Sequence, residues 1–261
     1  MSERQPQTQV NTSKPHPARV YDWLLGGSDN YPVDQAVGKQ LPDLGRRSAK
    51  QNRAFMRRAS AWVASQGVDQ FLDIGVGIPT APNLHQVVQE INPKARIVYT
   101  DNDPIVLRHA EALLYSTADG ALDYVAADVR EPGAVLDGAS VCLDFRRPVA
   151  LSLIALMHYI PDGDGPYDIV RTLLDALAPG SYLVLSHGTF DFHRELEAGI
   201  VRAYGDGGIE LRCRTRDEVA RFFDGLDLLE PGLVTGPEWY KDTAAPEPED
   251  NAVYAGVART R

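Results

Sequence analysis

Cysteine is scarce in this sequence, because Cys142 and Cys213 are the only two among 261 residues. Two thiols make neither a disulfide framework nor a cysteine-based zinc cluster. The chain also lacks an apolar run long enough to cross a bilayer. Its first residues are polar and rich in glutamine, unlike those of a signal peptide. These features predict a cytoplasmic protein with reduced thiols and no association with a membrane.

Basic residues are outnumbered by acidic ones, 26 against 36, which gives a net charge of −10. A nucleic-acid partner would require a basic face, so that class of function is disfavoured. The local basic cluster in residues 46–58 is typical of the solvated face of one amphipathic helix. Most of the six histidines are scattered, and no ligand cluster supports a metal-dependent reaction, so we expect no metal.

The most informative stretch is residues 71–80, Phe-Leu-Asp-Ile-Gly-Val-Gly-Ile-Pro-Thr. Its apolar start is too short for a helix and predicts a buried strand. Gly75 and Gly77 permit a tight turn and the close approach of a ligand to the backbone. Pro79 suits the first turn of a helix, and apolar residues then recur at helical spacing as far as Ile91. The stretch therefore predicts a strand, a glycine turn and a helix in direct succession.

A glycine turn between a strand and a helix usually holds a nucleotide-like ligand. A dinucleotide site has a third glycine where this chain has Thr80, which weakens the interpretation as an NAD or FAD site. The carboxylate of Asp73 would repel a pyrophosphate but attract a cation. The pattern therefore favours S-adenosylmethionine, which carries a sulfonium and an ammonium and no phosphate. The alternative is a strand, turn and helix that bind no ligand.

Two further acidic residues follow the next two predicted strands. Asp101 lies about 20 residues after the glycine turn, the spacing at which a second strand presents an acid to a ribose hydroxyl. Asp103, before Pro104, is instead expected to cap a helix. Asp128 ends the third strand, where an acid can accept from the adenine amino group beside the backbone N–H of Val129. The alternative for Asp101 and Asp103 is that both only cap a helix. Three acids at three successive strand ends are a more specific signal than any one alone.

These three segments resemble the first motifs of the class I, Rossmann-like methyltransferases. Residues 17–31, 51–55 and 71–80 are also similar to a bacterial family of S-adenosylmethionine methyltransferases long catalogued as a domain of unknown function. The similarity covers nearly the whole chain after about residue 15. It implies S-adenosyl-L-methionine as cofactor and S-adenosyl-L-homocysteine as product, but no particular substrate. The cofactor-binding set that we expect includes Asp73, Gly75, Gly77, Asp101, Asn102, Asp128 and Val129.

Strands that alternate with helices predict a parallel sheet covered by helices on both faces. The resemblance implies a doubly wound, Rossmann-like α/β sheet of seven strands with the last one antiparallel. We expect a disordered tail over residues 1–15, a helical cap or lid over residues 16–66, and the S-adenosylmethionine-binding domain over residues 67–261. The cap and the domain are expected to form a single globular unit, in a monomer or a homodimer.

Residues 20–31 combine aromatic side chains with a Gly-Gly-Ser-Asp-Asn turn. One interpretation is a short helix and turn packed on the domain. The other is a lid that closes over cofactor and acceptor, with the glycines as its hinge. The resemblance favours the lid, which would place Tyr21 among the cofactor-binding residues and Tyr31 beside the acceptor.

Ligands bind beyond the carboxyl ends of the strands in open α/β sheets, and two histidines are expected there. His158 follows the fourth predicted strand and His187 ends the fifth, so both are candidates for a general base. The alternative for His158 is a local hydrogen bond that closes the cofactor pocket. In this fold residues after the fourth strand commonly close that pocket, and Met157 is therefore assigned to the cofactor site.

The expected function is methyl transfer from S-adenosylmethionine to an oxygen or nitrogen of a small-molecule acceptor, by in-line displacement. Tyr159, Trp239 and Tyr240 are candidates to line an apolar acceptor pocket, although such aromatic residues more often belong to the core or its rim. A second hypothesis is a non-catalytic, regulatory protein that binds S-adenosylmethionine on the same fold. A third is an NAD(P)-dependent oxidoreductase, against which Thr80 counts.

Overall fold

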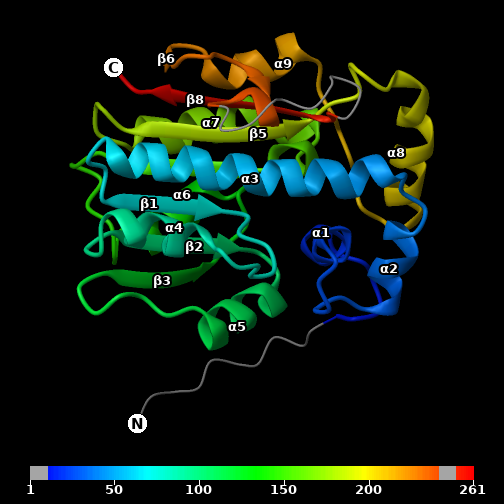
Figure 1. Ribbon diagram of the computed structural model, residues 1–261, viewed down its shortest axis with the longest axis horizontal. Helices are drawn as coiled ribbons and strands as arrows, with labels where there is room; N and C mark the ends of the chain where they lie inside the picture. Colours follow the sequence, from blue (N-terminus) through cyan, green and yellow to red (C-terminus); the bar gives the residue numbers. More distant parts are fainter. Residues whose placement is uncertain (1–10, 241–250) are drawn as a thin grey trace.

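The computed structural model describes residues 11–240 and 251–261, so residues 1–10 of the expected disordered tail lie outside the described residues. Strands and helices alternate from β1 to β5, as Figure 1 shows. The strands are β1 (Gln70–Ile74), β2 (Arg96–Asp101), β3 (Ala121–Ala126), β4 (Ala150–Ile154), β5 (Tyr182–Gly188), β6 (Asp227–Leu228), β7 (Val234–Thr235) and β8 (Val253–Arg259). The α-helices are α1 (Pro17–Leu25), α2 (Pro32–Gly38), α3 (Asp43–Ser65), α4 (Leu84–Ile91), α5 (Pro104–Leu113), α6 (Pro132–Ala139), α7 (Pro166–Asp175), α8 (Glu197–Asp206) and α9 (Arg216–Ala220).

The strands form one sheet in the order β3-β2-β1-β4-β5-β8-β6, and β7 also pairs with β8. Strands β1 to β5 run parallel to one another, and β8 is antiparallel to β5. This confirms the doubly wound, mostly parallel sheet. The strand order reverses between β1 and β4, so the carboxyl ends of these strands border the point where such folds bind ligands.

The sheet has eight strands in the described part of the chain rather than the expected seven. The additional strand arises because residues 226–234 contain two short strands, β6 and β7, of two residues each, both antiparallel to β8. Pro231 and Gly232 separate them. Pro231 has no N–H to donate to a sheet, and Gly232 has a φ of 91°, so the chain leaves the extended conformation between the two strands.

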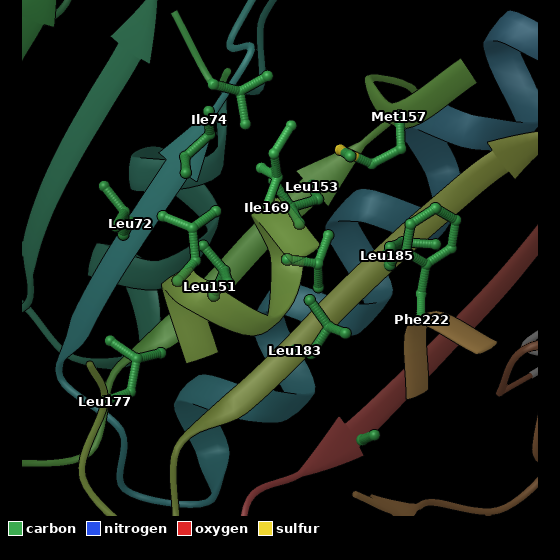
Figure 2. Close-up of a cluster of buried hydrophobic side chains, with 14 of the residues drawn as sticks. Leu72, Ile74, Leu151, Leu153, Met157, Ile169, Leu177, Leu183, Leu185 and Phe222 are labelled. Atoms are coloured by element: carbon green, nitrogen blue, oxygen red, sulfur yellow. The ribbon is translucent and has the colours of Figure 1, made fainter. Parts of the chain in front are cut away.

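Helices cover both faces of the sheet, which explains why its central strands are apolar throughout. Successive strand side chains point to opposite faces. Phe71 and Ile97 belong to the buried cluster shared with α3 and α4, whereas Leu72 and Val98 belong to the cluster shared with α6 and α7. Figure 2 shows this second cluster, where side chains of neighbouring strands meet Ile169 of α7.

The long helix α3 crosses one face of the sheet, and α1 and α2 lie beside the carboxyl ends of the strands (Figure 1). Apolar residues of α3, among them Phe55 and Val63, lie in the same buried cluster as strand residues. Residues of the expected cap therefore share a core with the sheet. This packing fixes the position of α3 relative to the strand ends that follow.

Candidate cofactor and active site

A cavity of about 470 Å³ lies at the carboxyl ends of β1, β2, β3 and β4. This volume is in the range of small-molecule sites, about 300–1,000 Å³. Parallel strands bring their carboxyl ends to one edge of the sheet, so segments far apart in the chain meet there. The walls come from residues 15–21, 52–56, 73–77, 101–102, 127–130, 154–160 and 208–210, although not every residue of these segments contributes.

The glycine turn after β1 forms part of the wall. Gly75 and Gly77 have positive φ angles of 75° and 65°, a conformation that residues with a side chain rarely adopt. A Cβ atom on Gly75 would also lie 2.7 Å from Cδ1 of Leu156. Gly75 is therefore required by the close approach of Leu156 as well as by its φ, and Gly77 by its φ.

The turn does not open directly into a helix, so the expectation for Pro79 was wrong. Helix α4 begins five residues later, at Leu84, and the N–H of Asn83 donates to Oε1 of Gln86 at 2.7 Å. A helix that began at Pro79 would have Ile78 as its N-cap, and Ile78 has no side-chain oxygen to accept a hydrogen bond. Asn83 and Gln86 make a capping box instead, so residues 75–82 form a longer loop.

Asp101, the last residue of β2, is buried and is joined to the glycine turn. Its Oδ2 accepts a hydrogen bond from the Gly77 N–H at 3.0 Å, and its Oδ1 accepts one from the Asp103 N–H at 2.9 Å. Burial raises the pKa of Asp101, and these two donors oppose that rise. Each carboxylate oxygen has a second lone pair, so Asp101 can accept a ligand hydroxyl while it holds the turn. Asp103 caps α5 as expected, through the Ile105 N–H at 2.9 Å.

Asp128 lies beyond the end of β3, and Val129 lines the cavity beside it. Its carboxylate accepts hydrogen bonds from the Asn102 amide at 2.8 Å, the Arg130 N–H at 2.9 Å and the Arg130 guanidinium at 3.0 Å. Partial burial alone would raise the pKa of Asp128, but these donors and the Arg130 charge outweigh it and lower the pKa. The cavity therefore has an ionised carboxylate at this edge.

Asp73 of β1 and Arg53 of α3 reach the same cavity from different elements. Burial raises the pKa of Asp73 to about 6, and the Arg53 charge opposes this rise. The Arg53 guanidinium donates to the carbonyl oxygens of Thr80 and Pro82, the latter at 2.9 Å. Its Nε atom is buried and has no hydrogen-bond partner in the residues that the structure describes. The cavity thus combines a carboxyl group with a guanidinium N–H that is available to a ligand.

Arg53 is a site residue that the sequence analysis missed, because it was included in the solvated face of an amphipathic helix. That interpretation was wrong for this residue, although Arg57 on the same helix is exposed. Helix α3 is covered by the sheet on one side and by the loop of residues 80–82 on another, so the face that carries Arg53, beside the apolar stripe, is partly buried. The sequence did contain a signal for Arg53, because residues 51–55 are one of the segments that are similar to the bacterial methyltransferase family.

Helix α1 contributes Ala18 and Tyr21 to the cavity wall. The Tyr21 hydroxyl donates to the Ala49 carbonyl oxygen at 3.1 Å and accepts from the Asn52 amide at 2.9 Å. Oδ1 of Asn52 accepts in turn from the Ser186 hydroxyl at 2.6 Å. Burial raises the pKa of Tyr21, which keeps its hydroxyl neutral. This hydrogen-bonded chain joins α1, α3 and β5 at the edge of the cavity.

The two candidate histidines are buried and neutral. His158 accepts the Gly188 N–H at Nδ1, at 3.2 Å, and burial lowers its pKa to about 3. Burial, with His158 nearby, lowers the pKa of His187 well below its usual value. Both ring nitrogens of His187 are engaged, Nδ1 with the Gly188 carbonyl oxygen at 2.8 Å and Nε2 with the Arg214 guanidinium at 3.0 Å. Neither histidine is among the residues that line the cavity, and His158 makes a local hydrogen bond, as its alternative expected, without closing the cavity.

Met157 and Tyr31 lie outside the cavity wall, contrary to expectation. Met157 is fully buried in the core, with Leu153 and Leu185 near it in Figure 2, while the adjacent Leu156 lines the cavity. Strand β4 ends at Ile154, and the tight helical turn of residues 157–159 that follows points Met157 into the core. Tyr31 is the N-cap residue of α2 and packs near Ile105.

Trp239 and Tyr240 pack on α3 and are absent from the cavity wall. Trp239 is fully buried and makes edge-to-face contacts with Phe55 at 5.6 Å and Trp62 at 6.1 Å. Tyr240 stacks on Trp62 at 5.7 Å. These two aromatic residues therefore belong to the core and its rim, whereas Tyr159 does line the cavity.

A sequence profile of S-adenosyl methyltransferases matches residues 3–261. The chain belongs to this S-adenosyl methyltransferase family. A search of curated proteins found no match. The family uses S-adenosylmethionine.

Solved structures agree with this family and with its fold. A DUF574 family protein from Streptomyces avermitilis is 42% identical, with a TM-score of 0.93, over 97% of this chain and 100% of that one. A protein of Thermobifida fusca described as a candidate methyltransferase is 38% identical, with a TM-score of 0.87, over 95% and 96% of the two chains. A plantazolicin methyltransferase solved with S-adenosylhomocysteine shares only the fold, at 10% identity and a TM-score of 0.52, over 94% and 95%.

The residues of the cavity fit the cofactor of the S-adenosyl methyltransferase family. Asp73, Asp101 and Asp128 supply carboxyl groups, which suit a ligand with hydroxyl, amino and cationic groups and no phosphate. The buried Nε of Arg53 lacks a partner in the described part of the chain and can donate to the cofactor carboxylate. The glycine turn leaves room beside Gly77, where a Cβ atom would meet only Ala18, at 3.9 Å.

Two further properties concern residues 11–240 and 251–261 only. In these ranges no helix combines the length and the apolarity that a membrane span requires. In the same ranges no three His, Cys, Asp or Glu side chains converge as a metal site would need.

Proposed function

We propose that this protein transfers a methyl group from S-adenosylmethionine to an oxygen or nitrogen atom of a small-molecule acceptor. The observation that carries this proposal is the convergence of Asp73, Asp101 and Asp128, from three successive strands, on one cavity beside the glycine turn. Membership of the S-adenosyl methyltransferase family supports the cofactor and the reaction type. The acceptor class and the acceptor atom are part of the proposal.

We assign the cofactor contacts by the chemistry of each carboxyl group. Asp101 accepts the ribose hydroxyls with the lone pairs that Gly77 and Asp103 leave. Asp128, which accepts a hydrogen bond from the Asn102 amide, accepts another from the adenine amino group, and the N–H of Val129 faces the adenine ring beside it. The Asp73 carboxylate accepts a hydrogen bond from the ammonium group of the cofactor's methionine part, and Arg53 donates to the carboxylate of that same part. Tyr21 closes this site from α1.

The bound cofactor supplies a methyl group that its sulfonium already activates. With the cofactor bound, the acceptor lone pair would form the new bond to the methyl carbon, the carbon–sulfur bond would break with its electron pair on sulfur, and the acceptor proton would pass to water. The protein orients the acceptor and excludes competing water from the line of attack. His158 holds its proton on Nε2, because Nδ1 accepts the Gly188 N–H, so we assign it a positioning role.

The same proposal includes the class of acceptor, the location and oligomeric state of the protein, and the role of the N-terminal helices. A net charge of −10 supports a small molecule rather than a nucleic acid as the acceptor. We propose a cytoplasmic location and a monomer or homodimer. The α1 segment, which reaches the cavity with Ala18 and Tyr21, is proposed to act as a lid, with residues 16–66 as its helical cap.

Transfer of a labelled methyl group tests this function. The protein is incubated with methyl-labelled S-adenosylmethionine and, in separate reactions, a panel of small phenols and amines, RNA, or an unrelated protein. We expect label in the small-molecule fraction and its loss in the Asp101→Ala variant. Label only in RNA or protein would contradict the proposed acceptor class. Binding of cofactor with no transfer to any acceptor would favour a non-catalytic, regulatory role.

A further inference from the structure

A second cavity, of about 120 Å³, adjoins the cofactor cavity. Tyr21, Asn52, Ala155 and Tyr159 line both cavities, so the two share a wall. The rest of the second cavity comes from α1, residues 41–49, the segments after β4 and β5, α8 and residues 252–253. It therefore lies on the side of β4 and β5, where a molecule would approach a cofactor held by β1, β2 and β3.

We infer that this second cavity is the acceptor pocket, and that the acceptor is an uncharged molecule with an apolar group about the size of one six-membered ring. The inference rests on the proposed function and adds to it the class of substrate. The acceptor's hydroxyl or amine lies at the wall that the two cavities share, facing the cofactor.

The size of the acceptor pocket sets the size of the group that it holds. An engineered apolar cavity of about 150 Å³ stays dry and binds benzene. The acceptor pocket has about 120 Å³ and apolar walls that include Leu24, Leu44, Ile200 and Leu211. A single ring or an aliphatic group of similar volume therefore fits.

The walls of the acceptor pocket carry no charged side chain, which decides between a neutral and a charged acceptor. Burial lowers the pKa of His158 to about 3, and it raises the pKa of Cys213 and that of Tyr204 to about 12. Burial also raises the pKa of Tyr21 and of Tyr159, so all five groups are neutral at pH 7. A charged acceptor would lose its hydration there without a counter-charge, which is costly.

One polar group in the acceptor pocket lacks a partner. Ser48 is 8% exposed, and its buried hydroxyl has no hydrogen-bond partner in residues 11–240 or 251–261. Buried hydroxyls in native proteins are nearly always paired with protein groups or ordered water, so the Ser48 hydroxyl offers a ligand or a water molecule an unused hydrogen bond in this wall. Tyr21 also keeps a lone pair, because its hydroxyl accepts only from Asn52 in the described contacts. An acceptor with one hydroxyl or amine can satisfy these groups.

Ala155 shapes the shared wall. Its φ of 54° is in the left-handed region, which residues other than glycine rarely adopt. Its N–H is held by the carbonyl oxygen of Ser186 at 3.2 Å and by the Ser186 hydroxyl at 3.0 Å. Ala155 lines both cavities with a side chain that ends at Cβ, so it is a thin part of the wall that they share.

Phenol and 4-hydroxybenzoate test the inference, by NMR titration of protein saturated with S-adenosylhomocysteine. Ile200→Trp fills the acceptor pocket from α8, and Val201→Trp is its matched control, because Val201 is the next residue, is 38% exposed and does not line the pocket. Ala252→Leu is a second filling variant for the case in which Ile200→Trp does not fold. Calorimetry with S-adenosylhomocysteine and the melting temperature are recorded for each variant.

We expect phenol to bind the wild type and Val201→Trp equally, and to bind Ile200→Trp or Ala252→Leu at least tenfold more weakly. We expect 4-hydroxybenzoate to bind the wild type at least tenfold more weakly than phenol does. Equal affinity of phenol for filled and control variants, equal affinity of the two probes, or no binding of phenol would overturn the inference. Failure of S-adenosylhomocysteine itself to bind would instead count against the proposed function.

Discussion

The carboxylate of Asp101 accepts a hydrogen bond from the backbone N–H of Gly77 at 3.0 Å, which ties the end of β2 to the glycine turn after β1. A second bond, from the Asp103 N–H, fixes the other carboxylate oxygen. The side chain therefore arrives at the cavity in one orientation. Asp101 can therefore accept hydrogen bonds from ribose hydroxyls while the glycine turn after β1 keeps its conformation.

Replacement of Asp101 by alanine should weaken binding of S-adenosylmethionine by about 5- to 150-fold, because hydrogen bonds to a charged group at a buried site are worth about 1–3 kcal/mol. Calorimetric titration measures the change. Asp101→Asn keeps one acceptor oxygen for the two backbone donors. Its affinity for S-adenosylmethionine should therefore lie between that of the wild type and that of Asp101→Ala. Asp119→Ala, an exposed acid outside the cavity, is the control. Unchanged affinity in Asp101→Ala, with the fold intact, would refute the ribose assignment.

The contribution of the Asp73 carboxyl group to the stability of the free protein, measured as the difference between the wild type and Asp73→Asn, should fall as pH rises from about 4 to about 6, because burial raises the pKa of Asp73 from 3.8 to about 6. A raised carboxyl pKa means that the folded state holds the proton more tightly, so its stabilising effect is lost as that proton leaves. Asp73→Asn should therefore stabilise the free protein at pH 7 by up to about 3 kcal/mol. Urea unfolding at pH 4, 5, 6 and 7 measures this. A variant no more stable than the wild type at pH 7 would contradict the effect.

Cofactor affinity should change with pH in the opposite direction. The ammonium of S-adenosylmethionine binds ionised Asp73, whose pKa is about 6, so affinity should fall by up to tenfold per pH unit below that pH. Titrations from pH 5 to pH 7.5 measure the slope. In Asp73→Asn the affinity should be weaker at pH 7 and nearly flat over this range. An equally steep slope in the variant would show that another group is responsible.

Arg53→Gln should weaken binding of S-adenosylhomocysteine by about 10-fold or more, as expected for loss of a charge-assisted hydrogen bond of about 1.5–3 kcal/mol. Binding of 5′-methylthioadenosine, which lacks the amino and carboxyl groups, should hardly change. The comparison of the two ligands separates loss of a carboxylate partner from general damage to the cavity. Arg57→Gln, on the exposed face of the same helix, serves as the matched variant. Equal losses for both ligands would argue against the assignment of Arg53.

Trp239→Ala should reduce the free energy of unfolding by about 3–5 kcal/mol, the usual cost of truncating a large buried aromatic residue. Trp239 is fully buried against Phe55 and Trp62 and lines neither the cofactor cavity nor the acceptor pocket. The affinity of the folded fraction for S-adenosylhomocysteine should stay within about twofold, because distant sites usually behave independently. Chemical denaturation and calorimetry test the two statements. A large loss of affinity with normal stability would reinstate Trp239 as a site residue.

Much of the sheet could be predicted because its signals are local. Short apolar runs that end in Asp73-Ile-Gly or at Asp101 are set by burial and by turn chemistry within a few residues. These patterns placed the acids at strand ends, and parallel pairing then brings the ends together. The N-cap role of Asp103 was predicted for the same reason.

The features that the sequence did not predict depend on contacts between distant segments. The burial of Arg53 follows from the loop of residues 80–82 that covers α3, and that loop exists because Asn83, not Ile78, caps the next helix. The division into β6 and β7 depends on pairing with β8 at the far end of the chain. Met157 turns inward because the chain leaves β4 early. None of these contacts leaves a periodic pattern in one segment.

The central claim is that the cavity at the ends of β1 to β4 binds S-adenosylmethionine, and calorimetric titration of the purified protein tests it most directly. S-adenosylmethionine and S-adenosylhomocysteine are titrated in turn, with NAD as the control. The account predicts micromolar affinity for the first two ligands and no binding of NAD. Failure of both to bind, or tighter binding of NAD, would contradict it.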